Sequence, residues 1–171
     1  MPYIYFGVIL ISFIVIGGDS IKALGFRASS QGIRYAIIEK QDEGCTLCNH
    51  DSENRIVYPA NVDDIAYKLA WIKAEVDRII RQNPKIDIAA IKTNEYSIAE
   101  KAATRETAYI DAVCMLSLQE QNIPIQRFIY KQLYTSSSKV KEDAEAMVGK
   151  TALYWDAKIA DAIIAACKVL S

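Results

Sequence analysis

A short apolar run between two helical segments constrains the fold of this chain more than any other feature. The run covers residues 86–91, and helix-like sequence precedes and follows it. A short strand that is apolar on both faces and lies between helices is typical of a buried parallel strand. The sequence therefore predicts an α/β domain with helices on the faces of a sheet.

The segment before this run has the pattern of a β-hairpin followed by a third strand. Residues 21–26 and 32–39 are strand-like, and the small polar residues 28–31 between them predict a tight turn. A further short strand is predicted at residues 55–60, and a last one at residues 124–130. Together with the buried run, these segments predict a mixed five-stranded sheet flanked by helices.

Four helices are predicted from apolar positions at helical spacing and from capping residues. Asn61 is expected to cap the first helix and Asp156 the last, because both side chains can accept hydrogen bonds from free N–H groups. Ser97 and Glu100 form a capping box for the second helix. The predicted ranges are 62–80, 98–121, 139–148 and 157–169.

The composition fits one globular domain in a reducing compartment. The chain has 171 residues, of which 51% are hydrophobic and 24% charged, enough for one core. A net charge of −1 gives no overall basic surface for nucleic acid, although local basic patches stay open. Cys114 and Cys167 fall in predicted buried helices, where free cysteine acts as a small apolar residue. This favours a cytoplasmic protein over a disulfide scaffold.

The first 20 residues form a segment apart from the domain predicted at residues 21–171. Residues 2–18 are apolar and uncharged, and their length is at the short end for a membrane span. Three interpretations stay open. The segment is a membrane anchor, an extension upstream of the true start, or a β-branched segment packed on the domain or on a partner.

Four stretches carry a resemblance to a known family. In this chain, ALGFRASSQGIRYAII corresponds to the first hairpin of that family's fold, and IDIAAIKTNEY corresponds to its fourth strand. The fifth strand with the helical segment after it is matched by IPIQRFIYKQLYTSSSKVKEDAEAMVGK, and the closing helix by WDAKIADAIIAA. In this order and spacing they resemble the ribonuclease H-like fold, and within it the RuvC-type Holliday-junction resolvases, over roughly residues 21–171.

The resemblance implies two-metal hydrolysis of phosphodiesters by carboxylates on Mg²⁺. The family's first-strand Asp position falls on Phe26 or Arg27, and its fourth-strand Glu position falls on Lys92. The carboxylate position of the last helix falls on Asp161, a possible Mg²⁺ ligand. Only one of the three positions keeps its carboxylate, so the resemblance implies a degenerate active site.

Two functional hypotheses follow from the resemblance. In one, the protein is a structure-specific nuclease that uses Mg²⁺ on a rearranged set of Asp161, Asp156 and Glu95. In the other, it is a non-catalytic relative that binds nucleic acid, branched or single-stranded, or a protein partner, as a dimer or tethered to a membrane. Arg27 and Lys92 then either bind phosphate or pair with Asp161 and Glu95 as a structural ion network.

A basic segment near the fifth strand is a second candidate site for nucleic acid. Lys131, Lys139 and Lys141 lie around a serine-rich stretch, residues 135–138, at the start of a predicted helix. A helix N-terminus attracts anions through its free N–H groups and its dipole. The alternative interpretation is a serine-capped helix with a solvated face.

Cys45, Cys48 and His50 form a possible zinc motif in the polar stretch 41–54. A structural zinc site needs four ligands, so Asp51 or a second subunit would have to complete it. Two alternatives stay open, loop cysteines without a metal and a redox pair.

Overall fold

The sheet has six strands and a mixed topology. The computed structural model describes residues 20–42, 44–97 and 101–171. The main path through the sheet runs in the order β3-β2-β1-β5-β6, and β4 pairs with β2 beside this path. The strands are β1 (Ile21–Ser29), β2 (Gly32–Gln41), β3 (Gly44–Leu47), β4 (Arg55–Val57), β5 (Ile88–Lys92) and β6 (Ile125–Phe128).

The pairing of the strands confirms the predicted mixed sheet. β1 and β2 form an antiparallel hairpin, while β5 runs parallel to β1 and β6 runs parallel to β5. β3 pairs with the last residues of β2 and β4 with the first ones, so these two short strands share one edge. β4 is shorter than the strand predicted at residues 55–60. β3 lies in the polar stretch 41–54, for which the sequence predicted a loop and no strand.

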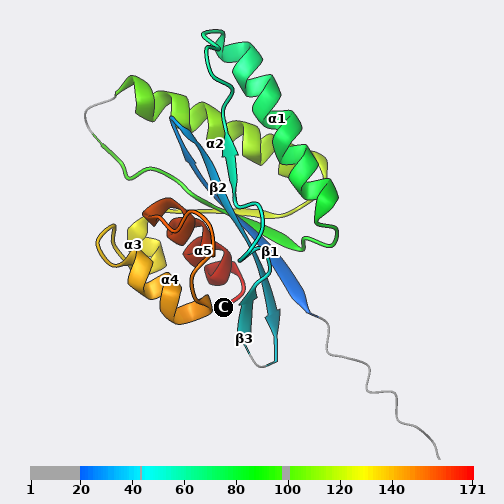
Figure 1. The fold of residues 1–171 in the computed structure, drawn as a ribbon, viewed down its shortest axis with the longest axis vertical. Coiled ribbons are helices and arrows are strands. Elements are labelled where there is room, and N and C mark those ends of the chain that lie inside the picture. The colour runs from blue at the N-terminus through cyan, green and yellow to red at the C-terminus, as the bar shows by residue number, and fades with distance from the viewer. Residues whose placement is uncertain (1–19, 43, 98–100) are drawn as a thin grey trace, which may run out of the picture.

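The helices cover both faces of the sheet (Figure 1). α1 and α2 lie on one face, and α3, α4 and α5 lie on the other. Each face has its own apolar core, because successive side chains of a strand point to opposite sides. The helices are α1 (Ile65–Gln82), α2 (Ala102–Glu120), α3 (Tyr130–Leu133), α4 (Val140–Val148) and α5 (Ala157–Val169).

The helix starts differ in part from the prediction. Asp64 caps α1, accepting hydrogen bonds from the N–H groups of Ala66 and Tyr67 at 2.8 and 3.3 Å. The predicted cap, Asn61, has a φ of 59° and lies in the preceding turn. α2 begins at Ala102, and Glu100 of the predicted capping box lies outside the described residues. Asp156 caps α5 as predicted.

Close packing of α5 on β1 fixes the arrangement of the core. A Cβ atom on Gly25 would lie 2.0 Å from the carbonyl oxygen of Ala162. A glycine at this position therefore lets the helix backbone approach the strand. As a result, Asp161 of α5 lies against the C-terminal end of β1.

The structure adds one fact about membranes. In residues 20–42, 44–97 and 101–171, no helix is long and apolar enough to cross a membrane. The predicted anchor, extension or packed strand at residues 2–18 lies outside the described part of the chain.

Candidate functional site

Arg27 of β1 and Asp161 of α5 form a buried ion pair. The Nε atom of Arg27 lies 3.2 Å from Oδ2 of Asp161, and the exposed fractions of the two side chains are 16% and 3%. Phe26 points into the core under α1 and α2, so the next residue, Arg27, points toward α5. The strand alternation thus brings the cation to the carboxylate.

The end of β5 holds the rest of the Arg27 guanidinium. Its Nη1 donates to the carbonyl oxygen of Lys92 at 3.1 Å, and its Nη2 donates to Oδ1 of Asn94 at 2.9 Å. Because β1 and β5 pair in parallel, their C-terminal ends lie side by side at the same end of the sheet. Both Nη atoms therefore have hydrogen-bond partners, whereas Nε faces Asp161 as an ion pair without meeting the geometry of a hydrogen bond.

Lys92 is buried at the same sheet edge and pairs with Glu95. Its Nζ donates to Oε1 of Glu95 at 2.9 Å and to the carbonyl oxygen of Thr93 at 2.7 Å. The ammonium also lies 3.8 Å from the ring centroid of Tyr130, within cation–π range. Burial lowers the pKa of Lys92, although the bond to Glu95 opposes this change. Glu95 Oε1 also accepts from the backbone N–H of Tyr130 at 2.9 Å.

Asp161 keeps one oxygen without a hydrogen bond. Burial raises the pKa of its carboxyl, while Arg27 and the Tyr130 hydroxyl act in the opposite direction. Oδ1 is buried and accepts no hydrogen bond from any residue that the structure describes. Tyr130 thus contacts Glu95 through its backbone N–H, and its hydroxyl helps to lower the pKa of the Asp161 carboxyl.

Arg27, Lys92, Glu95 and Asp161 together are called the ion-pair cluster below. It contains two ion pairs, Arg27 with Asp161 and Lys92 with Glu95. The same two pairs are the ones that the sequence suggested as the alternative to phosphate binding. Mg²⁺ prefers several oxygen ligands, whereas each carboxylate here already faces a protein cation. The described part of the chain has no group of three or more His, Cys, Asp or Glu side chains that could hold a metal ion. The residues present at this site do not fit a Mg²⁺ pair.

Asp156, a further predicted catalytic residue, has a different set of partners. Its Oδ2 accepts from Nε and Nη2 of Arg34 at 2.9 and 2.7 Å. Its Oδ1 accepts from the N–H groups of Lys158 and Ile159, both at 2.9 Å. Both oxygens are engaged in capping α5 and tying it to β2. The structure does not bring this carboxylate together with those of Asp161 and Glu95.

The predicted basic segment is exposed. Lys131 lies in α3, Lys139 is the N-cap residue of α4, and Lys141 follows in its first turn. None of the three makes an ion pair with the described residues. The hydroxyls of Ser136 and Ser138 lie 3.0 Å apart, and α4 has no side-chain cap. The three ammonium groups are thus free to meet an anionic partner.

The cysteine motif is spread along the sheet edge. Cys45 lies in β3 and packs toward α5, on the side of the buried Cys167. Cys48 is exposed after the strand ends, and the His50 side chain lies 3.5 Å from Asp51. No metal-binding group of the kind predicted from Cys45, Cys48 and His50 is assembled among the described residues.

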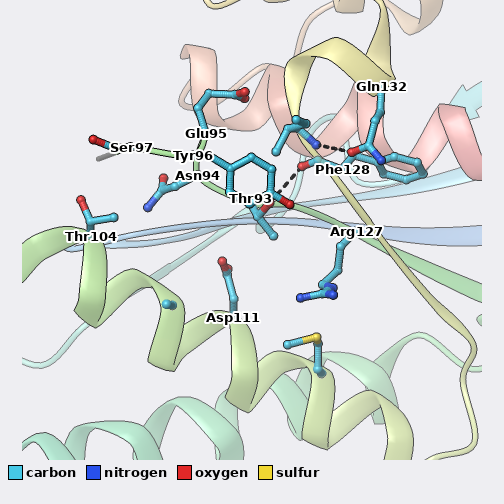
Figure 2. A pocket seen from close by; sticks show the side chains of 13 residues that line it. Thr93, Asn94, Glu95, Tyr96, Ser97, Thr104, Asp111, Arg127, Phe128 and Gln132 are labelled. Carbon is cyan, nitrogen blue, oxygen red and sulfur yellow. Dashed lines mark hydrogen bonds between the residues drawn. The ribbon is translucent and has the colours of Figure 1, made fainter. Parts of the chain in front are cut away.

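The structure also contains a pocket beside the ion-pair cluster, which the sequence did not predict (Figure 2). It contains Asp111 of α2 and Arg127 of β6, and neither was a predicted site residue. One signal was available. Asp111 shares the buried face of α2 with Thr107, Cys114 and Leu118, where a carboxylate is unusual.

Comparisons with known proteins agree on the fold. The chain is similar to Thermus thermophilus RuvC in complex with Holliday junction substrate, at 10% identity and a TM-score of 0.70, covering 86% of this chain and 91% of that one. A second Thermus thermophilus RuvC structure matches at 11% identity and a TM-score of 0.68. The match covers 86% of this chain and 92% of that one. The yeast mitochondrial Holliday junction resolvase Ydc2 matches at 12% identity and a TM-score of 0.55. The match covers 86% of this chain and 77% of that one.

These likenesses show the fold alone. The predicted ribonuclease H-like fold is confirmed, with a topology that matches RuvC. No protein-family model matches the sequence, and the search of curated proteins gave no match.

Proposed function

We propose that this protein is a nucleic-acid-binding module of the resolvase fold in which protein cations replace the catalytic metal ions. The observation that carries the proposal is the buried ion pair between Arg27 and Asp161. The resemblance puts carboxylates at the positions of Arg27 and Lys92 in active relatives. Here both positions are cationic, and both cations have partners within the protein.

Electrostatics supports a site that rejects divalent cations. A guanidinium and an ammonium beside Asp161 repel a Mg²⁺ ion, and this repulsion is weakly screened at a buried position. Displacing either cation would also leave buried donors without partners, which costs free energy. The cluster therefore favours a structural role over metal-dependent hydrolysis.

The exposed lysines near α3 and α4 are the proposed contacts to nucleic acid. Lys131, Lys139 and Lys141 lack ion-pair partners among the described residues, so they can bind phosphates without breaking a protein contact. Each phosphate contact releases counterions and makes binding dependent on salt. The RuvC structure with a Holliday junction substrate supports a branched DNA as the first ligand to test.

The experiment measures binding and cleavage on the same samples. A labelled four-way junction, a duplex and a single strand are titrated by fluorescence anisotropy at several salt concentrations, with EDTA or with Mg²⁺. We expect binding in EDTA and no cleavage with Mg²⁺. Lys139→Gln with Lys141→Gln should lower the salt-dependence slope by roughly two, because two phosphate contacts are lost.

A matched control has the same charge change elsewhere. Arg81 and Lys85 are exposed near the start of β5, at the sheet edge opposite the ion-pair cluster. Replacing both by Gln should leave the affinity for DNA unchanged. Equal losses in the two double variants would show that only net charge matters, and absence of binding to all three DNAs would overturn the proposal.

One observation favours the alternative, a Mg²⁺-dependent nuclease with a rearranged site. Asp161 Oδ1 is free of hydrogen bonds within the described residues, and the Glu95 side chain is 46% exposed. If cleavage with Mg²⁺ is seen and Asp161→Asn abolishes it, the nuclease hypothesis replaces the binding module.

A further inference from the structure

The pocket beside the ion-pair cluster lies between α2, the segment after β5, and β6 (Figure 2). Its volume is about 570 Å³, within the range of small-molecule sites. One stripe of α2 forms a wall, because positions spaced by three or four residues share a helix face. This stripe consists of Thr104, Ala108, Asp111 and Met115.

Asp111 is a buried carboxylate without a partner in this pocket. Its exposed fraction is 6%, and its carboxyl group points from α2 into the pocket. Oδ1 accepts no hydrogen bond from the described residues. A buried carboxylate that lacks hydrogen-bond donors is costly, so such a group in a pocket indicates a ligand that brings donors.

Arg127 adds a free cation to the same pocket. It lies in β6, is exposed, and makes no hydrogen bond or ion pair with the described residues. Burial raises the pKa of Asp111 to about 7, while Arg27, Lys92 and Arg127 act to lower it. The pocket thus offers a carboxylate acceptor and a planar fork of donors.

We propose that this pocket binds a guanine base, with Asp111 accepting hydrogen bonds from N1–H and N2–H and Arg127 donating to the O6 side. Guanine has two adjacent donors on its Watson–Crick edge, which match the two oxygens of an ionised carboxylate. Arginine is a common partner of guanine O6 and N7. Adenine and cytosine have one donor beside one acceptor, and uracil has a donor between two acceptors.

The base has two possible sources, an unpaired nucleotide of a nucleic acid strand and a free guanine nucleotide. The first source rests on the nucleic-acid-binding function proposed above, and the second does not. Binding of mononucleotides therefore tests the pocket independently of the binding module.

The charge state of Asp111 makes the base preference dependent on pH. Above pH 7 the ionised carboxylate matches guanine. Below pH 7 the carboxyl group has one donor and one acceptor, which match adenine or cytosine. The charged and titratable groups that line the pocket or interact electrostatically with Asp111 are Arg27, Tyr58, Lys92, Glu95, Cys114 and Arg127.

The first experiment measures the affinity of the full chain for the four nucleoside 5′-monophosphates by calorimetry at pH 6 and pH 8. We expect the guanine nucleotide to bind at least tenfold more tightly than the other three at pH 8. Its affinity should fall about tenfold at pH 6, because the ionised fraction of a group with a pKa near 7 falls by that factor. Equal binding of all four nucleotides, or no binding, overturns the assignment of the pocket.

Two variants separate the pocket from general effects of charge. Asp111→Asn presents one amide NH2 donor group and one carbonyl acceptor at every pH, so the guanine preference and its pH dependence should both vanish. Asp77→Asn changes an acidic residue of α1 outside this pocket and should leave both unchanged. If Asp111→Asn does not fold, the pH-dependent change of preference in the unaltered chain decides alone.

The second experiment compares oligothymidylates that carry one central guanine, adenine or abasic site. If a central guanine raises the affinity and Asp111→Asn removes this increase, the result supports binding of an unpaired guanine in the pocket within a nucleic acid complex. Strand binding without base preference, together with no mononucleotide binding, overturns this inference and leaves the proposed function standing. Binding of the free guanine nucleotide without any DNA binding supports the pocket and overturns the proposed function.

Discussion

Arg27 Nε lies 3.2 Å from Asp161 Oδ2, and this contact joins the C-terminal end of β1 to the N-terminal half of α5. Residues far apart in the chain thus neutralise each other at a buried position. Because neither side chain is well exposed to water, removal of one partner leaves an uncompensated charge. The stability of the fold should therefore depend on this pair more than on any pair at the surface.

The ion pair gives the first prediction. Arg27→Met removes the cation and keeps an apolar side chain, so Asp161 is left unpaired. We expect a loss of about 3–5 kcal/mol in the free energy of unfolding, measured by urea denaturation. Adding Asp161→Asn should restore much of the loss. Lys73→Met breaks more exposed pairs with Asp77 and Glu120 and should cost far less stability than Arg27→Met.

Asp111 gives a prediction about stability and pH. Burial raises its pKa from 3.8 to about 7 in the folded state, so folding favours the protonated form. Its contribution to stability is full below about pH 4, falls as pH rises, and is lost above pH 7. Asp111→Asn should therefore be more stable than the unaltered chain at pH 8, by up to about 4 kcal/mol. Denaturation curves at pH 5 and pH 8 should show this advantage shrinking at the lower pH; a constant difference would contradict the assignment.

The close approach of α5 to β1 gives a third prediction. Gly25→Ala puts a Cβ atom 2.0 Å from the Ala162 carbonyl oxygen, so the helix has to move away from the strand. We expect a loss of about 3 kcal/mol or more in thermal or urea unfolding. Ala23→Gly is on the same face of β1 and should cost only about 1 kcal/mol. Similar losses in the two variants would show that the contact is easily relieved.

The two roles of Asp156 can be separated by comparison with Asp64. Both residues cap a helix, and Asp156 also pairs with Arg34. Replacement by Ala should cost about 1 kcal/mol at Asp64 and about 1–2 kcal/mol at Asp156. DNA binding should be unchanged in the Asp156 variant. A selective loss of DNA binding there would return this residue to the functional site.

Much of the fold could be predicted because its signals are local. The hairpin turn, predicted at residues 28–31 and found at Ser30 and Gln31, and the apolar run of β5 follow from patterns within a few residues. The cap at Asp156 also depends only on its own helix. β3 was missed because it is a short edge strand whose stability comes from backbone pairing with β2, which leaves little trace in its side chains.

The candidate site was predictable only in part. The resemblance to the resolvases predicted that Arg27, Lys92 and Asp161 lie close together, and charge predicted the pairs of Arg27 with Asp161 and of Lys92 with Glu95. Asp111 and Arg127 were missed because their meeting depends on how α2 lies against β6, which no local pattern specifies. The shift of the α1 cap from Asn61 to Asp64 has a simpler cause, since several polar residues in a row can each start a helix.

The ion-pair cluster has a consequence for engineering. Its four side chains carry two positive and two negative charges, so the cluster as a whole is neutral. Exchanging Arg27→Asp together with Lys92→Glu would turn it into four carboxylates with a total charge of −4. Two divalent ions would restore neutrality. In charge alone, two substitutions separate a cluster that neutralises itself from one whose neutrality would depend on bound divalent ions.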